Sequence, residues 1–311
     1  MLFKKNFISF LINIVIKQFK KMKGIAREVV EEISKSENKI IMILGGIDVG
    51  KTFLIENIAK FLSDSIDIGI VDIDMGQSHI GPPTTIGWGI VRDGFKDWED
   101  IEVIDMFFVG DTTPFKNLLP TITGAEYITG KAKLDTEKIL IDTTGLVLGI
   151  IGRILKWNLI EIIRPNVIIT LERENELDHL LKVYKNTKAF KIFRLPSPRG
   201  AKIKSQLSRN NYRKKMFGEY FKNSKIVNLS SENISVRCYN GIDLEGISTL
   251  KNRVVSLRNF NEEDLALGII SEYDNKNGMF SIITPKESPD DIRSMIIGAI
   301  MINKEGEQLE K

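Results

Sequence analysis

The sequence is almost without cysteine. Its 311 residues contain one, Cys238. A single cysteine excludes an intramolecular disulfide framework and provides no cluster of thiolate ligands for a metal ion. This usage is typical of proteins in a reducing compartment, and we expect a cytoplasmic location.

A hydrophobic run long enough to cross a membrane is missing from the N-terminal region. The apolar stretch Phe7 to Ile16 is shorter than the ~20 residues that a spanning helix needs, and KQFKKMKG follows it instead of a small-residue cleavage site. We therefore expect no stable membrane insertion. We interpret residues 1–37 as a basic, helical segment that docks on the protein or precedes a functional start at Met22. A basic amphipathic helix at a membrane or partner surface is the alternative.

A strong net charge is absent as well. The formal charge is +3, so composition does not indicate a nucleic-acid-binding protein, and any basic surface must be local. The apolar content of 42% and the charged content of 27% are typical of globular proteins. The length allows a large domain and a smaller one, each with a buried core.

The most informative stretch that is present runs from Gly45 to Thr52 and reads GGIDVGKT. It matches G-x-x-x-x-G-K-[ST] and lies between the strand-like KIIMIL and the helix-like FLIENIAKFL, the context that a phosphate-binding loop requires. Lys51 is expected to reach the β- and γ-phosphates and Thr52 to hold a metal ion. The predicted nucleotide contacts are Gly45, Gly46, Ile47, Asp48, Val49, Gly50, Lys51, Thr52 and Phe53.

Strand-like and helix-like segments alternate across residues 38–222, which predicts an α/β domain with a doubly wound, mostly parallel sheet. We expect DMGQSHIGPPTTIGWG, which begins at Asp74, to be loop over much of its length because glycine and proline are frequent there. Residues 223–305 change to short alternating runs with turn pairs such as Asn240-Gly241 and Asn277-Gly278. They predict a small β-rich C-terminal domain.

Acidic residues stand where two of the predicted strands end, and ligands collect at such ends in parallel sheets. Asp72 and Asp74 are two positions apart and can share a face; one could bind Mg²⁺ and the other could accept a proton. The alternative is that one of them caps the turn before Gly76. The second strand end, Asp142 to Gly145 (DTTG), matches the D-x-x-G sensor of GTPases and related ATPases.

That match keeps a nucleotide-hydrolysing switch open as an interpretation. Against this interpretation, the later predicted strands of the α/β domain are not followed by the N-K-x-D motif that recognises guanine in GTPases. Gly46 and Ile47 also occupy the positions where dimerising partition-type ATPases carry an additional lysine.

A basic helix is predicted after the last strand of the α/β domain. Arg209 and Arg213 are four positions apart and so share one face of this helix. Such a pair can stabilise charge on a transferred phosphoryl group. The alternative is a solvated basic surface.

These blocks in this order resemble the polynucleotide 5′-hydroxyl kinase family, whose members act in mRNA 3′-end, tRNA and pre-ribosomal RNA processing or as stand-alone archaeal RNA kinases. The resemblance rests on GGIDVGKT, on D-x-x-Q from Asp74 to Gln77, on T-x-G from Thr143 to Gly145, and on R-x-x-x-R from Arg209 to Arg213. It covers about residues 38–222, and the later text is similar to the family's β-rich C-terminal domain.

The resemblance implies roles for these residues. Asp74 is the expected general base for the 5′-hydroxyl, Gln77 helps to place metal or substrate, and Thr143 and Gly145 belong to a loop that holds the acceptor strand. Arg209 and Arg213 cover the triphosphate. The implied catalytic set is Lys51, Asp74, Arg209 and Arg213, and the implied metal set is Thr52, Asp72 and Gln77.

The sequence departs from the family pattern in two places. Leu146 stands where eukaryotic members often carry a tryptophan that can stack on a base, and the separate N-terminal β domain of larger members is missing. Trp88 could offer a stacking face or pack in the core.

The leading interpretation is a kinase that uses ATP and Mg²⁺ to phosphorylate the 5′-hydroxyl of RNA, with DNA as a second acceptor. The alternatives are a P-loop GTPase or ATPase switch and an inactive nucleotide-binding scaffold in RNA processing. The sequence does not identify a protein partner, and no adenine-reading residue can be located in it.

Overall fold

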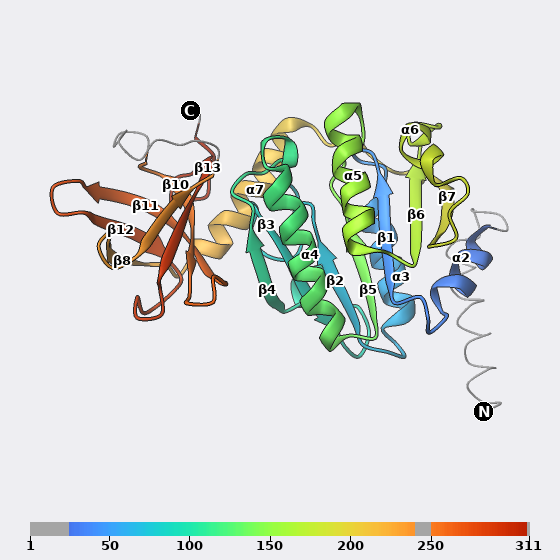
Figure 1. The fold of residues 1–311 in the computed structure, drawn as a ribbon, viewed down its shortest axis with the longest axis horizontal. Coiled ribbons are helices and arrows are strands. Elements are labelled where there is room, and N and C mark those ends of the chain that lie inside the picture. Colours follow the sequence, from blue (N-terminus) through green and yellow to red (C-terminus); the bar gives the residue numbers. More distant parts are fainter. Residues whose placement is uncertain (1–24, 240–249, 310–311) are drawn as a thin grey trace. The chain divides into compact units, whose positions relative to one another are not determined.

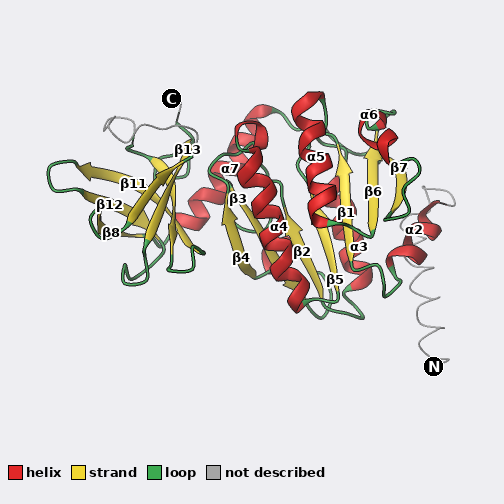
Figure 2. Cartoon of the chain, in the orientation of Figure 1, coloured by secondary structure: helices red, strands yellow, loops and turns green. Residues whose placement is uncertain are grey.

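Helices and strands alternate along the first two thirds of the chain, and strands dominate the remainder (Figures 1 and 2). The computed structural model describes residues 25–239 and 250–309. The predicted N-terminal segment up to residue 24 and the predicted turn at Asn240-Gly241 lie outside these residues.

The elements of the first part are α2 (Ile25–Ile33), β1 (Ile40–Gly45), α3 (Lys51–Leu62), β2 (Ile68–Asp72), β3 (Thr85–Val91), η1 (Trp98–Asp100), β4 (Val103–Phe108), η2 (Pro114–Lys116), α4 (Leu118–Asp135), β5 (Lys138–Asp142), α5 (Gly149–Ile163), β6 (Val167–Glu172), α6 (Asp178–Leu181), η3 (Lys182–Tyr184), β7 (Lys191–Pro196) and α7 (Gln206–Phe221). The later strands are β8 (Lys225–Ser230), β9 (Ser235–Cys238), β10 (Arg253–Arg258), β11 (Asp264–Asp274), β12 (Met279–Thr284) and β13 (Ser294–Met301).

Seven strands form the first sheet, in the order β4-β3-β2-β5-β1-β6-β7. Strand β1 pairs in parallel with β5 and β6, and β6 pairs in parallel with β7. Every residue of β1, β5 and β6 is buried, because α5 covers one face of these strands and α3 the other (Figure 1). Burial on both faces explains the near-continuous apolar text of these strands. The predicted α/β fold with a mostly parallel sheet is confirmed.

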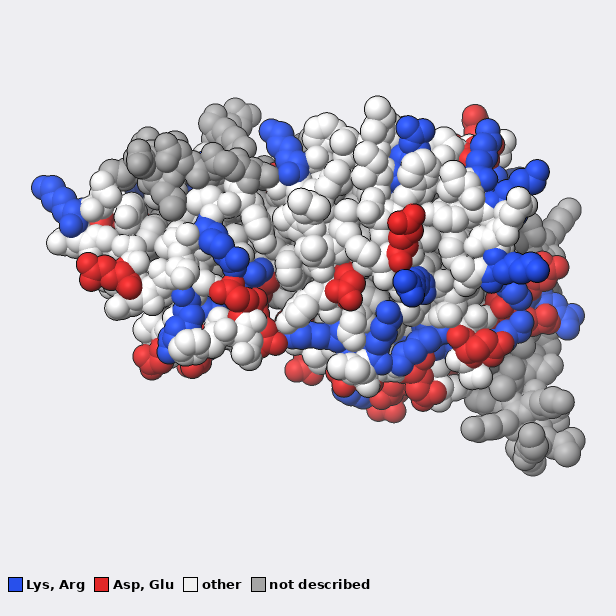
Figure 3. Space-filling model, viewed as in Figure 1, with Lys and Arg blue, Asp and Glu red and all other residues white. Residues whose placement is uncertain are grey.

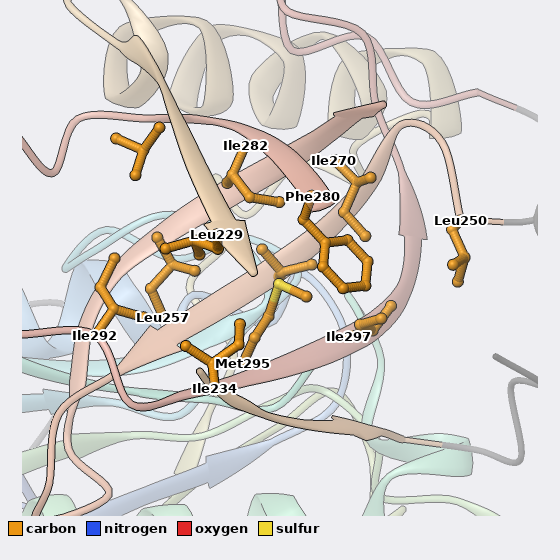
Figure 4. Packing of buried hydrophobic residues seen from close by; sticks show 12 residues of the cluster. Leu229, Ile234, Leu250, Leu257, Ile270, Phe280, Ile282, Ile292, Met295 and Ile297 are labelled. Carbon is orange, nitrogen blue, oxygen red and sulfur yellow. The ribbon is translucent and has the colours of Figure 1, made fainter. Parts of the chain in front are cut away.

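Six strands form the second sheet, in the order β8-β12-β11-β10-β13-β9. Its pairs are antiparallel except for β13 with β9. Side chains from five of the strands gather in one apolar cluster that includes Leu229, Leu257, Ile270, Phe280 and Met295 (Figure 4). The β-rich C-terminal part is therefore also confirmed.

The stretch from Asp74 that was expected to be loop over much of its length is loop up to residue 84, but its last part belongs to β3, which was not predicted and whose text, TIGWGIV, carries two glycines. Both glycines lie where another part of the backbone approaches the strand. A Cβ atom at Gly87 would stand 2.2 Å from the carbonyl oxygen of Ile80, and one at Gly89 would stand 2.5 Å from that of Glu102. The glycines thus permit close packing of a strand. Trp88 between them is buried in the core, so it offers no stacking face.

The chain divides into two compact units, each described by itself below. Of the described residues, unit 1 comprises 25–71, 89–102 and 129–203, and unit 2 comprises 72–88, 103–128, 204–239 and 250–309.

The helices and the surface charges of the described residues can be compared with the composition. No helix among the described residues has the length and apolar character needed to cross a membrane. Lysine and arginine side chains are interspersed with acidic ones on the face seen in Figure 3, as expected for a small net charge.

Candidate active site

The phosphate loop, Gly45–Thr52, connects the end of β1 to the start of α3 in unit 1. Gly50 precedes the helix with φ 94°, and Asp48 has φ 56°. Glycine adopts such left-handed backbone without a steric penalty, and aspartate tolerates it better than most residues. The turn directs the loop into the N-terminus of α3, where free N–H groups and the helix dipole attract anions.

Segments that follow β6 and β7 support this loop within unit 1. The Ser197 hydroxyl donates to the Val49 carbonyl oxygen at 3.0 Å. Arg173 Nη2 donates to the Asp48 carbonyl oxygen at 2.9 Å, and a Cβ atom at Gly50 would stand 3.3 Å from Pro198. Arg173, Ser197 and Pro198 were not identified from the sequence. Their positions after two parallel strands, where ligands collect, are the signal that points to them.

Lys51 and Thr52 begin α3, and both side chains make polar contacts in unit 1. Lys51 Nζ donates to the Gly46 carbonyl oxygen at 2.7 Å. The Thr52 hydroxyl donates to Asp142 Oδ2 at 2.8 Å, although 90 positions separate the two residues. Asp142 was predicted only as the acid of a possible hydrolytic sensor. Its contact with Thr52 places a carboxylate beside the hydroxyl that is expected to bind metal.

Oxygen donors of this kind fit Mg²⁺. A hydroxyl and a neighbouring carboxylate suit a hard cation such as Mg²⁺. In phosphate sites Mg²⁺ usually has only one or two protein ligands, and waters and phosphate oxygens complete its coordination. The described residues include no group of three or more histidine, cysteine or acidic side chains that could enclose an ion by themselves. The residues present therefore fit a Mg²⁺ ion that arrives with the phosphates, and they do not fit a protein-enclosed metal centre.

The β5–α5 loop, residues 143–148, follows Asp142 in unit 1. The Thr143 hydroxyl is buried and donates to the Ile43 carbonyl oxygen of β1 at 2.8 Å. The predicted acceptor contact of Thr143 therefore competes with a structural bond. Gly145 lies against the phosphate loop: a Cβ atom there would stand 2.9 Å from the Ile47 nitrogen and 2.8 Å from its Cα.

Asp72 ends β2 and organises the start of the β2–β3 loop, residues 73–84, in unit 2. Its carboxylate accepts from the backbone N–H of Asp74 at 2.9 Å and of His79 at 2.6 Å. With 1% of its surface exposed, this carboxylate needs such donors. The observed contacts are those of a loop-organising residue, and its role as a metal ligand stays a prediction.

Asp74 and Gln77 lie on this loop. Asp74 is half-buried, and its Oδ1 accepts from the Gly76 N–H at 3.3 Å. Gln77 Nε2 donates to the Gly76 carbonyl oxygen at 2.8 Å. The other end of this side chain, Oε1, is buried and has no hydrogen-bond partner among the described residues. A buried acceptor of this kind suits a cation, a water or a hydroxyl donor.

Helix α7 brings the two arginines close to Asp74 within unit 2. Arg213 is buried, and its Nη2 donates to Asn210. Burial and the nearby charge of Arg209 lower the pKa of Arg213, while the charge of Asp74 opposes that shift. Removal of a guanidinium from water costs less when an anion is near. The charges of Asp74 and Arg209 thus both act on Arg213, and the catalytic roles of these three residues stay predictions.

Tyr212, between the two arginines, holds α7 to the β2–β3 loop. Its hydroxyl donates to the Ser78 carbonyl oxygen at 2.8 Å. Its ring centroid lies 5.7 Å from that of His79. Neither residue was identified from the sequence.

The fold and the phosphate loop define a P-loop protein with a parallel sheet. The chain belongs to the CLP1 P-loop family: the model of the mRNA cleavage and polyadenylation factor CLP1 P-loop matches residues 45–223. This confirms the family predicted from the four motifs.

Relatives in archaea are similar over most of their length. The polyribonucleotide 5′-hydroxyl-kinase MJ1315 of Methanocaldococcus jannaschii is 30% identical, with 86% of this chain and 88% of the relative covered. The polyribonucleotide 5′-hydroxyl-kinase PF0112 of Pyrococcus furiosus is 28% identical over 86% of this chain and 89% of the relative.

Two solved structures share the fold. They are a wild-type Clp1p–Pcf11p complex and a Clp1p–Pcf11p structure whose description concerns ATP loss in a point mutant. Each has a TM-score of 0.68 and 14% identity and covers 87% of this chain, and this chain covers 76% and 77% of them, respectively. At this identity the likeness concerns the fold alone.

Proposed function

We propose that this protein transfers the γ-phosphate of ATP to the 5′-hydroxyl of RNA. The observation that carries the proposal is the group formed by a half-buried carboxylate, Asp74, and two guanidinium groups, Arg209 and Arg213, in a chain that also has a complete phosphate loop. A carboxylate that accepts a proton beside two cationic groups suits transfer of a phosphoryl group to a hydroxyl. The names of the archaeal relatives support RNA as the acceptor.

The proposed reaction assigns each group one task. The phosphate loop and Lys51 bind the β- and γ-phosphates through N–H and ammonium donors. Asp74 accepts the proton of the 5′-hydroxyl as the O5′ atom bonds to the γ-phosphorus and the bond to the β,γ-bridging oxygen breaks. The products are 5′-phosphorylated RNA and ADP. Arg209 and Arg213 stabilise negative charge on the transferred group, as positioning and charge stabilisation dominate such reactions.

The metal ion belongs with Thr52 and Asp142 in this proposal. The Thr52 hydroxyl would bind Mg²⁺ directly, and Asp142, which already contacts that hydroxyl, would hold a water in its shell. Bound Mg²⁺ neutralises charge on the β- and γ-phosphate oxygens. Gln77 keeps its predicted place as a further oxygen donor to metal or acceptor, which its buried Oε1 supports.

Phosphate transfer to an oligonucleotide tests the proposal. The purified protein is incubated with γ-labelled ATP and either a 5′-hydroxyl oligoribonucleotide or the DNA oligonucleotide of the same sequence. We expect label on the RNA, loss of label with Lys51→Ala, and a loss of about 10²- to 10⁴-fold with Asp74→Asn because the general base is removed.

Nucleotide binding separates the roles of the variants. Asp74→Asn and Arg209→Ala are expected to bind ATP nearly as well as the wild type while turnover falls, because both residues act on the transferred group. Equal loss of binding and turnover in Arg209→Ala contradicts its role in the transition state. Release of free phosphate without label on either oligonucleotide, with GTP preferred, favours the switch. Retention of ATP with neither reaction favours the scaffold.

A further inference from the structure

Lys156 is a lysine with no exposed surface. It lies on α5 in unit 1, and its exposed fraction is 0%. Nζ donates to the carbonyl oxygen of Thr144 at 2.7 Å. Transfer of an ammonium group from water to a protein interior is costly unless the group is well hydrogen-bonded. An apolar side chain such as methionine would avoid this desolvation cost. We therefore expect the buried ammonium group to have a specific role.

The carbonyl that Lys156 holds belongs to the β5–α5 loop, between the two residues predicted to meet the acceptor. Thr144 follows Thr143 and precedes Gly145, and its hydroxyl accepts from the Leu146 N–H at 3.2 Å. Next in the chain, the Gly145 backbone lies against that of Ile47 in the phosphate loop. A shift of the Thr144 peptide therefore changes the contact between these two loops.

A second pair of contacts fixes the other end of the loop. His179 Nε2 donates to the Val147 carbonyl oxygen at 2.8 Å. Gly152, one turn before Lys156 on α5, packs on Val147 so closely that a Cβ atom would stand 2.7 Å from the Val147 carbonyl carbon. The loop is thus held at residue 147 by packing and at residue 144 by the ammonium group.

We propose that Lys156 is a positioning residue that sets the place of the β5–α5 loop against the phosphate loop and so orients the acceptor hydroxyl. The effect on catalysis rests on the proposed function, whereas the effect on the loop does not. A misplacement of about 1 Å in an oriented reaction can cost about 100-fold in rate. The hydrogen bond from Lys156 on α5 to the Thr144 carbonyl oxygen limits such movement of the loop.

The chain offers a matched control in Lys138. This lysine also lies in unit 1, has 4% of its surface exposed, and donates from Nζ to the carbonyl oxygens of Lys35 at 2.6 Å and Asn38 at 2.9 Å. It begins β5, whereas the β5–α5 loop follows the end of that strand. The five residues of β5, at ~3.3 Å per residue, separate the carbonyl groups held by Lys138 from the β5–α5 loop. Replacement of either lysine removes a buried ammonium group that donates to backbone carbonyl oxygens. Lys138 does so before β5, and Lys156 does so after it.

The test compares Lys156→Met with Lys138→Met in the full chain. Amide hydrogen exchange reports the loop directly, and thermal unfolding reports stability. We expect faster exchange at residues 145–148 in Lys156→Met only. For the transfer reaction we expect kcat/KM for the oligoribonucleotide to fall about 10- to 100-fold in Lys156→Met and to stay within about twofold of wild type in Lys138→Met, with ATP affinity nearly unchanged in both.

Lys156→Gln, which stays polar but lacks the charge and the length, extends the test if the methionine variant does not fold. The same local exchange is expected. Unchanged exchange at residues 145–148 in either folded variant overturns the proposal, as does a loss of kcat/KM that Lys138→Met shares. If the wild type transfers no phosphate, the proposed function fails while the exchange result still decides the role of Lys156.

Discussion

Gly145 has no side chain, and its neighbour Ile47 leaves no space for one. A Cβ atom would meet the backbone of Ile47 at distances below 3.0 Å, which flexible side-chain movement cannot relieve. The β5–α5 loop and the phosphate loop are therefore fitted to each other at the level of backbone atoms. A change at this residue acts on both loops.

We predict that Gly145→Ala weakens ATP binding by about 10- to 100-fold, since overpacking of this kind costs about 1–3 kcal/mol and the phosphate loop must move to relieve it. Titration calorimetry with ATP measures the change. Gly130→Ala is the control because no atom lies within 4 Å of the added Cβ; on helix α4 it should leave binding unchanged and raise the unfolding temperature slightly. Wild-type affinity in Gly145→Ala would contradict the geometry.

The sequence located the phosphate loop but not the contacts that its residues make. The motif Gly45–Thr52 identified the phosphate loop because its chemistry is local. The contact of Thr52 with Asp142 and the bond from Thr143 to Ile43 join residues 90 and 100 positions apart. No spacing rule contains such pairs, so Asp142 was assigned to a hydrolytic sensor and the Thr143 hydroxyl to the acceptor.

At the scale of elements, the buried strands were the most predictable part. The apolar text KIIMIL located β1, and β5 and β6 carry similar near-continuous apolar text. Strand β3 was missed because glycine indicates a turn in the sequence, whereas here it admits a neighbouring backbone. After β6 the α-helical segment is short, Asp178–Leu181. Backbone N–H groups of Arg173 and Glu174 donate to the Glu176 carboxylate.

Helix α2 is fixed in unit 1 by one buried carboxylate. Glu32 accepts from Lys191 at 2.6 Å on β7, from Lys35 at 2.8 Å and from Asn38 at 2.8 Å. Burial raises the pKa of Glu32, but the hydrogen bonds from Lys191, Lys35 and Asn38 outweigh it and lower the pKa from 4.5 to about 2. The carboxylate is thus more easily ionised in the folded protein than in the unfolded chain.

This shift predicts a loss of stability in acid. A lowered folded-state pKa contributes stability that is complete above the unfolded value of 4.5 and disappears as the pH falls towards about 2. Unfolding temperatures measured between pH 6 and pH 2.5 in buffers of equal ionic strength should fall less steeply for Glu32→Gln than for the wild type. Glu31→Gln, at an exposed position paired with Arg27, is the control. Parallel curves for Glu32→Gln and wild type would contradict the assignment.

At the scale of the whole molecule, the boundary predicted near residue 222 separates two kinds of sequence pattern. It does not separate two cores. Met106 and Phe108 of β4 and Phe217 and Phe221 of α7 are buried in one cluster with residues of the C-terminal sheet, all within unit 2. The C-terminal members of that cluster are Val254, Leu267, Ile269, Ile296, Ile300 and Ile302.

A chain that ends at Lys222 is therefore predicted to lose cooperative unfolding. It keeps every predicted site residue but exposes the four side chains of β4 and α7, each of which is worth about 1.5–3 kcal/mol when buried. Calorimetry and size-exclusion chromatography of the truncated chain measure the effect. A single cooperative transition near the wild-type temperature would instead support residues 38–222 as an independent domain.

The hydrogen bond from Tyr212 to Ser78 has a consequence for the timing of the catalytic cycle. It ties the arginine-bearing helix to the loop that carries Asp74, so in the proposed reaction the base and the charge-stabilising groups arrive and leave together. If that reaction takes place, displacement of α7 would also displace the base, and the base would then not be in place to activate water for hydrolysis of ATP.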